Sequence, residues 1–328
     1  MGFADIVWHQ RQLGTLRSAM TSGRLHHAYL FLGPEGVGKR MIAMALAKAI
    51  HCSESDQDYC GRCVNCARIT DGNHPDVRLI EPLADKKEIS IQQIRELQRE
   101  LNYRSFSGKR KTAIIDPAIL MNTSAQNALL KTLEEPPVDS LIFLIAPNGG
   151  GLLPTVRSRC LRLSFAPLPS AQVAAFLQSK YGMKADEAEF VAAMSMGSIG
   201  AADNLDKIEL VEKRRIWSDM LNSLKAEGYH GAMIAAEALS GSRDEALKFL
   251  KWAETWYRDL LIYSVTQKSD GLVNLDMLGS IAQQSAESSV SHKLSALSQT
   301  AGAAARIQRN LNRRMVLEKF LFGAVRGR

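Results

Sequence analysis

The most informative stretch of this sequence reads Gly33-Pro34-Glu35-Gly36-Val37-Gly38-Lys39-Arg40 and stands between a short apolar run and a helical pattern. In a phosphate loop, backbone N–H groups and the start of the next helix surround phosphate groups, and the lysine reaches the β and γ oxygens. The candidate nucleotide-binding residues are therefore Gly33, Gly36, Gly38 and Lys39. The pattern requires Ser or Thr in place of Arg40, because that hydroxyl ligates Mg²⁺. The loop is either vestigial or binds a nucleotide weakly.

Short apolar runs and helical patterns alternate through the first half of the chain. Five runs, bounded by Gly, Pro or Asp, are candidate strands: Ala28–Leu32, Val77–Ile80, Thr112–Ile115, Leu141–Ile145 and Leu161–Phe165. Ser90 and Gln93 have the spacing of a capping box that opens a helix, and a second helix is expected at Ser124–Leu133. This alternation predicts an α/β domain with a five-stranded parallel sheet covered on both faces.

The third of these strands ends in Asp116, in the position of the carboxylate that lies near Mg²⁺ in phosphate-loop ATPases. In catalytic versions a second acid follows and polarises the attacking water. Here Pro117 follows, and proline can neither accept a proton nor orient water. Together with Arg40, this change removes two essential parts of the site. The sequence therefore predicts that the chain is not an ATPase.

Four of the five cysteines are clustered: Cys52, Cys60, Cys63 and Cys66. An odd total with such a cluster indicates a metal site rather than disulfides. Four thiolates complete the tetrahedral shell of a structural Zn²⁺, and Gly61 suits the tight turn that the short spacings need. His51 and His74 are nearby but surplus. An iron–sulfur cluster and free thiols are the alternatives.

The composition indicates a globular protein of two or three domains, with 328 residues of which 46% are hydrophobic and 23% charged. A net charge of +7 is compatible with a polyanionic partner but does not require one. No apolar run approaches the roughly 18 residues of a membrane helix, and the start lacks the layout of a signal peptide. We therefore expect a cytoplasmic protein without membrane contact.

Pro167-Leu168-Pro169 indicates a domain boundary, after which we find no convincing series of strands. The predicted domains are residues 1–167, a small helical domain over 168–207 and a longer helical domain over 208–328. A stripe at helical spacing is more typical of a core than of a surface that stacks on bases: Phe249, Trp252, Trp256, Leu260 and Tyr263. The Ser/Ala-rich stretch 285–305 is either a weakly hydrophobic helix or a mobile connection.

These motifs together resemble the clamp-loader branch of the AAA+ ATPases. The matching segments cover about residues 8–165: Gly23-Arg24-Leu25-His26-His27-Ala28-Tyr29-Leu30-Phe31, the phosphate loop, the four cysteines, His74-Pro75-Asp76, the strand ending in Asp116, Asn127-Ala128-Leu129-Leu130-Lys131-Thr132-Leu133-Glu134-Glu135-Pro136-Pro137, and Ser158-Arg159-Cys160. The resemblance implies an AAA+ domain with an inserted zinc module at about residues 52–66, followed by a helical lid and a helical collar.

The resemblance also implies a role for Arg159. In this family the arginine of the Ser-Arg-Cys element reaches into the ATP site of a neighbouring subunit, where a guanidinium stabilises the charge that develops on the γ-phosphate. We assign this arginine finger to Arg159 and a structural role to Arg157. A surface arginine at the start of a strand is the alternative interpretation of Arg159.

Two further positions depart from the family's catalytic pattern. Ala146-Pro147-Asn148 stands where motor subunits carry a polar sensor, and Ala201 stands where they carry a phosphate-sensing arginine. Together with Arg40 and Pro117, these departures imply a stator, which is a subunit that lacks ATP turnover and holds the geometry of the ring.

The partners implied by the resemblance are ATP-hydrolysing gamma/tau motor subunits and a delta subunit in a hetero-pentamer. The sliding clamp and primed DNA would be reached through this complex, which is part of a DNA polymerase holoenzyme. Structural Zn²⁺ is the expected cofactor, and ATP binding is left open. The rival hypotheses are an active ATPase motor subunit and a free-standing zinc-dependent DNA-binding protein, but neither explains the full set of motifs.

Overall fold

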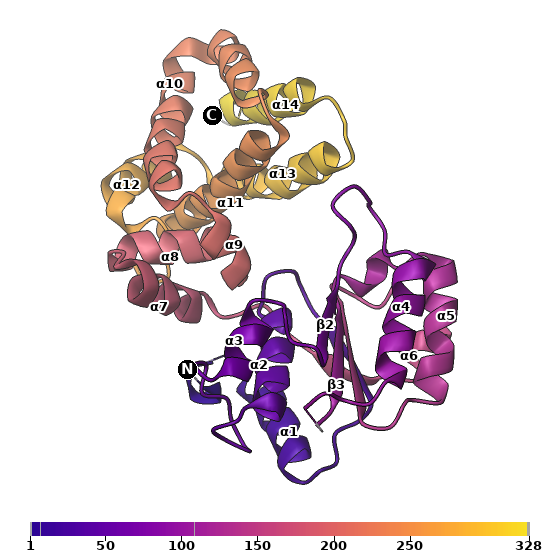
Figure 1. The fold of residues 1–328 in the computed structure, drawn as a ribbon. Coiled ribbons are helices and arrows are strands. Elements are labelled where there is room, and N and C mark those ends of the chain that lie inside the picture. The colour runs from indigo at the N-terminus through magenta and orange to yellow at the C-terminus, as the bar shows by residue number, and fades with distance from the viewer. Residues whose placement is uncertain (1, 7, 108, 327–328) are drawn as a thin grey trace. The chain divides into compact units, whose positions relative to one another are not determined.

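The computed structural model describes residues 2–6, 8–107 and 109–326. The chain divides into two compact units, shown in Figure 1. The first consists of Met1–Leu168 with Ser198–Gly200, and the second of Pro169–Gly197 with Ala201–Arg328. The separation of the helical part into residues 168–207 and 208–328 stays a prediction.

The first unit is built on a five-stranded sheet in the order β2-β3-β4-β1-β5, and every neighbouring pair is parallel. Its strands are β1 (Ala28–Leu32), β2 (Val77–Ile80), β3 (Lys111–Ile115), β4 (Ser140–Ala146) and β5 (Leu161–Ser164). Each lies within one residue of its predicted bounds. The predicted α/β class with a parallel sheet is confirmed.

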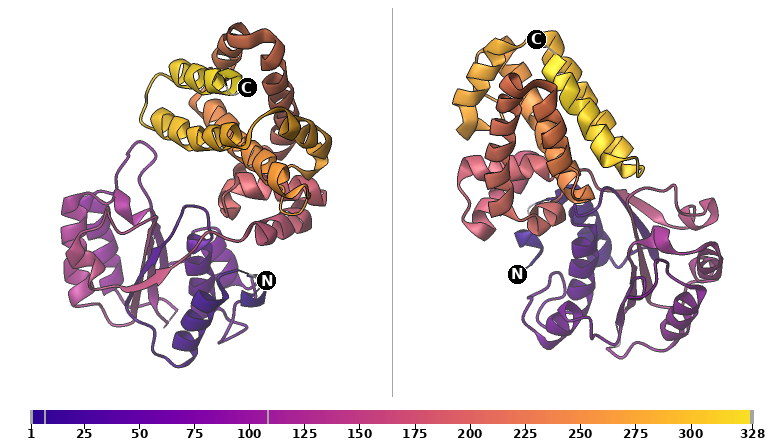
Figure 2. Two further views of the ribbon diagram at one scale, coloured as in Figure 1. Left: turned by 180° about the vertical axis from the view of Figure 1, so that it is seen from behind. Right: turned by 90° about the horizontal axis from the view of Figure 1, so that it is seen from above.

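Helices cover both faces of this sheet. In Figure 1, α1 (Gln10–Thr21), α2 (Lys39–His51) and α3 (Val64–Thr70) lie on one side, and α4 (Ile91–Asn102), α5 (Thr123–Glu134) and α6 (Pro154–Arg157) lie on the other. The view from above in Figure 2 shows the same separation, with indigo helices on one side of the strands and magenta helices on the other. Short 3-10 turns occur at Phe3–Asp5 (η1) and Ala118–Leu120 (η2).

Burial explains why the strands could be recognised as apolar runs. All seven residues of β4, which lies at the centre of the sheet, are buried, whereas the edge strand β2 buries only Val77 fully. A parallel sheet covered on both faces needs apolar side chains on both faces of its central strands. The start of α4 could also be predicted from the sequence, since Ser90 and Gln93 form the expected capping box there.

The second unit is helical throughout its described residues. Its elements are α7 (Ser170–Tyr181), α8 (Ala185–Met194), α10 (Lys207–Leu239), α11 (Arg243–Thr266), η3 (Leu275–Met277), α12 (Leu278–Glu287), α13 (Val290–Gln308) and α14 (Arg313–Arg326), and α9 (Ile199–Asn204) begins in the first unit. α10 is interrupted at Gly228, where φ is +61°.

The aromatic stripe of α11 forms core as predicted at four of its five positions, because Phe249, Trp252, Trp256 and Leu260 are buried, whereas Tyr263 is half-buried. The stretch 285–305 contains the end of α12 and most of α13, so it is helical and is not a mobile connection. Within the described ranges, no helix is both long and apolar enough to cross a membrane.

Candidate functional site

The phosphate loop leaves the carboxyl end of β1 and leads into α2, as its sequence predicts. Gly33 has φ +154°, and a Cβ built there would lie 2.1 Å from the carbonyl oxygen of Phe165, so no larger residue fits without movement. Gly38 caps the start of α2 with φ +105°, and its Cβ would meet the indole nitrogen of Trp8 at 3.1 Å. The backbone around the loop is therefore closely packed.

Lys39 lies within the loop and is only 6% exposed. Its ammonium donates hydrogen bonds to the carbonyls of Gly33 and Pro34, each at 2.5 Å. Burial lowers the pKa of Lys39, an effect opposed by the negative charges of Asp116 and Glu35. The lysine that would reach phosphate oxygens is thus engaged by carbonyls of its own loop.

Arg40 joins the two carboxylates that face the loop. Its Nε donates to Oδ2 of Asp116 at 2.5 Å, and its Nη2 donates to Oε1 of Glu81 at 2.5 Å. Glu81 follows β2 and Asp116 follows β3, and these strands are neighbours in the sheet. The carboxyl ends of parallel strands meet at one edge, so Glu81 could have been found from the sequence, although we did not single it out.

The N-terminal segment also covers the loop, which the sequence analysis did not foresee. A ring nitrogen of His9 lies 2.9 Å from the carbonyl oxygen of Val37, and Trp8 is buried against Gly38. Burial lowers the pKa of His9, with Lys39 adding to that effect. On the other side, the N–H of Gly200 donates to the carbonyl of Gly36 at 2.9 Å, within the first compact unit.

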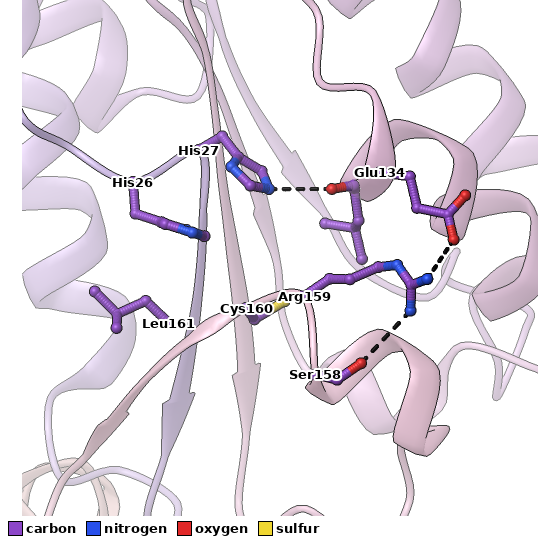
Figure 3. A pocket seen from close by; sticks show the side chains of 8 residues that line it. His26, His27, Glu134, Ser158, Arg159, Cys160 and Leu161 are labelled. Carbon is purple, nitrogen blue, oxygen red and sulfur yellow. Dashed lines mark hydrogen bonds and ion pairs between the residues drawn. The ribbon is translucent and has the colours of Figure 1, made fainter.

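Arg159 lies at a different place in the sheet, just before β5, and lines a cavity of about 490 Å³ (Figure 3). Its Nη2 is 2.6 Å from Oε1 of Glu134, and its Nη1 donates to the carbonyl of Thr155 at 2.9 Å. The side chain remains 35% exposed. The other lining residues are His26, His27, Leu133, Ser158, Cys160 and Leu161.

Two histidines line this cavity together with the arginine. The rings of His26 and His27 lie 4.3 Å apart, and Nε2 of His27 lies 3.1 Å from the carbonyl oxygen of Leu133. Burial, assisted by the proximity of His26, lowers the pKa of His27. Arg159 therefore has Glu134 as its ionic partner on the same chain, a residue that the sequence analysis quoted only as part of a motif.

Arg159 and the phosphate loop lie at opposite ends of two neighbouring strands: the loop follows the carboxyl end of β1, and Arg159 precedes the amino end of β5. The parallel register places Leu161 beside Tyr29, so Arg159 lies near the level of His27, before β1 begins. Gly33 lies six positions after His27, a span of about 20 Å at 3.3 Å per strand residue. The arginine consequently cannot contact a phosphate group held by its own loop.

The four clustered cysteines come together as predicted. Cys52 ends α2, Cys63 caps α3 and Cys66 lies in the first turn of α3. Their sulfur atoms all lie within 4.8 Å of one another, and three of the four side chains are buried. Sulfur atoms bound to one Zn²⁺ at 2.3 Å would be about 3.8 Å apart, so this donor set fits a tetrahedral metal ion after a small contraction.

Backbone hydrogen bonds reach two of the sulfur atoms in this cluster. The N–H of Cys63 donates to Sγ of Cys60 at 3.2 Å, and the N–H of Cys66 donates to Sγ of Cys63 at 3.4 Å. Burial opposes ionisation of Cys63, yet hydrogen bonds from Ser53 and Cys66 lower its pKa to about 5. Burial raises the pKa of Cys66 to about 12. The cluster can hold a metal ion; its position at the far end of α2 places it about 20 Å from the phosphate loop.

His51 and His74 form a separate buried group with Asp76. The carboxylate of Asp76 accepts hydrogen bonds from the backbone of Phe106 and Ser107 and from the hydroxyl of Ser105. Burial, chiefly, lowers the pKa of His51 to about 4. Asp76 thus fastens the loop before β3, and the two histidines do not join the cysteines.

Two other positions singled out in the sequence, Asn148 and Arg157, contact the loop that follows β4. Oδ1 of Asn148 accepts from the N–H of Gly150 at 2.9 Å, which engages this side chain in its own loop. Arg157 lies against the backbone of Gly149. The structural role expected for Arg157 stays a prediction.

Comparison with known proteins gives a consistent set of relatives. A family model described as DNA polymerase III, delta subunit, matches residues 8–169. The DNA polymerase III subunit delta' of Pseudomonas aeruginosa is 34% identical over 257 residues, which are 76% of this chain and 76% of that protein. The DNA polymerase III subunit tau of Escherichia coli is 38% identical over 173 residues, 52% of this chain and 26% of that protein.

Among solved structures, the crystal structure of a DNA polymerase III gamma subunit-related protein from Thermotoga maritima has a TM-score of 0.44 and 19% identity. The match covers 97% of this chain and 100% of the Thermotoga maritima chain. The match to the delta' protein spans three quarters of both sequences, whereas the match to tau spans about half of this chain and a quarter of tau.

Proposed function

Because the chain belongs to the DNA polymerase III subunit delta' family, we propose that it is a stator of the clamp loader, which supplies Arg159 to the ATP site of a neighbouring subunit and does not hydrolyse ATP itself. Membership of the family places it in the clamp-loader complex of DNA polymerase III. The division of labour within that complex is what its own residues must explain.

The observation that carries the proposal is the place of Arg159. It lies at the amino ends of the strands, whereas its own phosphate loop lies at their carboxyl ends. Its side chain lines an open cavity and is 35% exposed. Arg159 is held by Glu134 in an exposed ion pair, which contributes little free energy and can be exchanged for a stronger anion. A guanidinium so placed is too far from its own loop to reach a phosphate group held there, and it is open to a phosphate group brought by another chain.

The state of the chain's own loop supports the other half of the proposal. Lys39 is bonded to carbonyls of the loop, Arg40 stands in place of the hydroxyl that ligates Mg²⁺, and Pro117 stands in place of the acid that activates water. Each of the groups that phosphoryl transfer requires is therefore absent or engaged elsewhere. We propose that the loop has become a structural element.

The cysteine cluster has a structural role in this proposal. Its four thiols match the closed shell of a structural Zn²⁺, which leaves no coordination position for a substrate. The metal would join the end of α2 to α3 and would supply no chemistry to the neighbouring ATP site. The module would thereby stabilise the sheet domain from which Arg159 projects.

The partners follow from the same reasoning. Gamma/tau motor subunits would provide the ATP that Arg159 contacts, and a delta subunit would complete a hetero-pentamer that acts on the sliding clamp and primed DNA. The chain would therefore contribute to the loading of the clamp without polymerising DNA.

The experiment is ATP hydrolysis by a reconstituted clamp loader, stimulated by the clamp and primed DNA, with the wild-type chain or with Arg159→Ala. Loss of an arginine finger lowers turnover at the served site by roughly 10³-fold or more, so the total rate should fall by the share of that site. Arg162→Ala, an exposed arginine three residues later, is the matched control and should leave the rate unchanged.

Assembly is checked by size-exclusion chromatography of each complex, and the isolated chain should show no turnover. If Arg159→Ala assembles and hydrolyses ATP at the wild-type rate, the finger assignment is wrong. If the isolated chain hydrolyses ATP, the stator assignment is wrong.

A further inference from the structure

The side chain at position 40 supplies a positive charge at the place where phosphate-loop proteins recruit a metal ion. Arg40 uses two different nitrogens, Nε for Asp116 and Nη2 for Glu81, and both distances are 2.5 Å. One guanidinium therefore satisfies two carboxylates that belong to neighbouring strands. We propose that Arg40 is a built-in substitute for the divalent cation, so that the site formed by the loop and Asp116 takes no Mg²⁺.

Electrostatics explains why these carboxylates need a cation. The backbone N–H of Asp116 bonds to the carbonyl of Ile80, the residue before Glu81, so the two acidic residues leave the sheet side by side. The side chain of Asp116 is 14% exposed and that of Glu81 is 43% exposed, so water screens the repulsion between their negative charges only in part. A positive charge between them removes this repulsion.

An arginine is a permanent solution to that problem. Its guanidinium is not deprotonated in proteins, and its planar fork can donate to two acceptors at once. The charge at this position is consequently independent of the concentration of Mg²⁺. A serine or threonine in the same position would provide an oxygen ligand but no charge, which leaves the carboxylates to recruit a metal ion.

The same geometry excludes the metal ion. Mg²⁺ demands near-ideal octahedral geometry, gives up its waters reluctantly and is usually bound through one or two carboxylates whose negative charge it neutralises. At Asp116 the oxygen Oδ2 is already bonded to Arg40, and a divalent cation there would lie next to a positive guanidinium. The residues present therefore do not fit the Mg²⁺ that an active phosphate loop would hold.

Lys39 completes this arrangement. Its ammonium is bonded to the carbonyls of Gly33 and Pro34, so both cations of the loop neutralise or bridge groups of the protein itself. The loop keeps its shape through internal charges rather than through a nucleotide and its metal ion. This inference rests on the proposed stator function for its biological meaning, which it deepens by explaining how the site stays folded without turnover.

The test is the binding of Mn²⁺, a spectroscopic replacement for Mg²⁺, to the zinc-loaded full chain, measured by electron paramagnetic resonance with and without ADP. We expect no Asp116-dependent Mn²⁺ site in the wild type, so Asp116→Asn should leave its Mn²⁺ binding unchanged. Arg40→Ser should bind one Mn²⁺ per chain, with a dissociation constant at least tenfold lower than that of any residual Mn²⁺ binding by the wild type. Arg40→Ser combined with Asp116→Asn should lose that gain.

Arg78→Ala is the matched control, because Arg78 pairs with the single carboxylate of Glu100 in the same domain and its removal should create no site. Far-ultraviolet circular dichroism and zinc content establish that each variant is folded. The proposal is overturned if wild-type Mn²⁺ binding is lost in Asp116→Asn, or if folded Arg40→Ser gains no Mn²⁺.

If Arg40→Ser does not fold, the comparison of the wild type with Asp116→Asn still decides whether the native site takes a metal ion. This titration uses the isolated chain. A reconstituted loader that ignores Arg159→Ala would refute the proposed function and leave the Mn²⁺ result intact, so the two failures can be told apart.

Discussion

The phosphate loop and the Arg159 cavity treat their charged side chains in opposite ways. In the loop, Lys39 is 6% exposed and bonded to carbonyls, and Arg40 bridges two carboxylates. In the cavity, Arg159 pairs with a single carboxylate, that of the exposed Glu134, and donates to the carbonyl of Thr155. All three cations have partners in the chain, but Arg40 joins two carboxylates and Lys39 two carbonyls of its own loop, whereas Arg159 has one exposed carboxylate and lines an open cavity. We take this difference to separate a structural relic from a working element.

The largest effect on stability is expected from the four-cysteine cluster. The comparison of the phosphate loop with the Arg159 cavity depends on it, because both regions belong to the domain that the cluster would stabilise. Cys66→Ser should lose the bound zinc and lower the free energy of unfolding by about 3 kcal/mol or more, since metal binding to such sites is coupled to folding. Zinc content and thermal unfolding measure this.

Cys160→Ser serves as the matched control, because Cys160 is buried next to Arg159 but lies outside the cysteine cluster. It should retain the full zinc content. Equal metal content in Cys66→Ser and the wild type would show that the cluster is not the metal site.

The next effect concerns the loop as a structural element. Gly33→Ala should destabilise the chain by about 2 kcal/mol or more, because the added Cβ would meet the carbonyl oxygen of Phe165 at 2.1 Å. Gly72→Ala is the control, since Gly72 also has a positive φ, +73°, but its Cβ would meet nothing within 4 Å. Urea unfolding should show the larger loss for Gly33→Ala. Equal losses would mean that the close packing of the loop contributes no stability.

A smaller effect is expected at the cavity. A double-mutant cycle of Glu134→Gln and Arg159→Ala should give a coupling free energy below about 1 kcal/mol, as exposed ion pairs usually do. Such a weak coupling would leave Arg159 free to exchange Glu134 for a phosphate group. A coupling of several kcal/mol in urea unfolding would instead identify Arg159 as a structural residue and remove the contrast with Arg40.

The smallest effect is the response of the cavity to acid. Burial lowers the pKa of His27 in the folded chain, so the unfolded chain binds a proton first as the pH falls below about 6.5. The stability that neutral His27 contributes is present above that pH and is lost as the pH falls towards the lowered value. Urea unfolding at pH 7.5 and 5.5 should therefore show a smaller loss for His27→Gln than for the wild type. An equal loss would exclude His27 as a source of acid sensitivity.

The elements that the sequence predicted well are those with local signals. Buried parallel strands read as apolar runs, and the start of α4 carries its capping box at Ser90 and Gln93. The spacing of the four cysteines was enough to predict their cluster, and the structure brings their sulfur atoms within 4.8 Å of one another. These features depend on residues close together in the chain, so no knowledge of the tertiary structure was needed.

The elements that were missed depend on partners brought together by the fold. Glu81 pairs with Arg40, and Glu134 pairs with Arg159, across helices and strands that are distant in sequence. Trp8 covers the phosphate loop from a segment that carries no motif. In the sequence, Arg40 stands only for the loss of a hydroxyl, whereas in the structure its guanidinium bridges Asp116 and Glu81.

The most direct measurement compares Lys39→Ala with Arg159→Ala in the same reconstituted clamp loader, with ATP hydrolysis stimulated by the clamp and primed DNA. Because the loop is structural in our account, Lys39→Ala should leave the rate of an assembled complex within about twofold of the wild type. Arg159→Ala should abolish the contribution of the site it serves, a loss of roughly 10³-fold at that site. The account is contradicted if Lys39→Ala lowers the rate while Arg159→Ala leaves it unchanged.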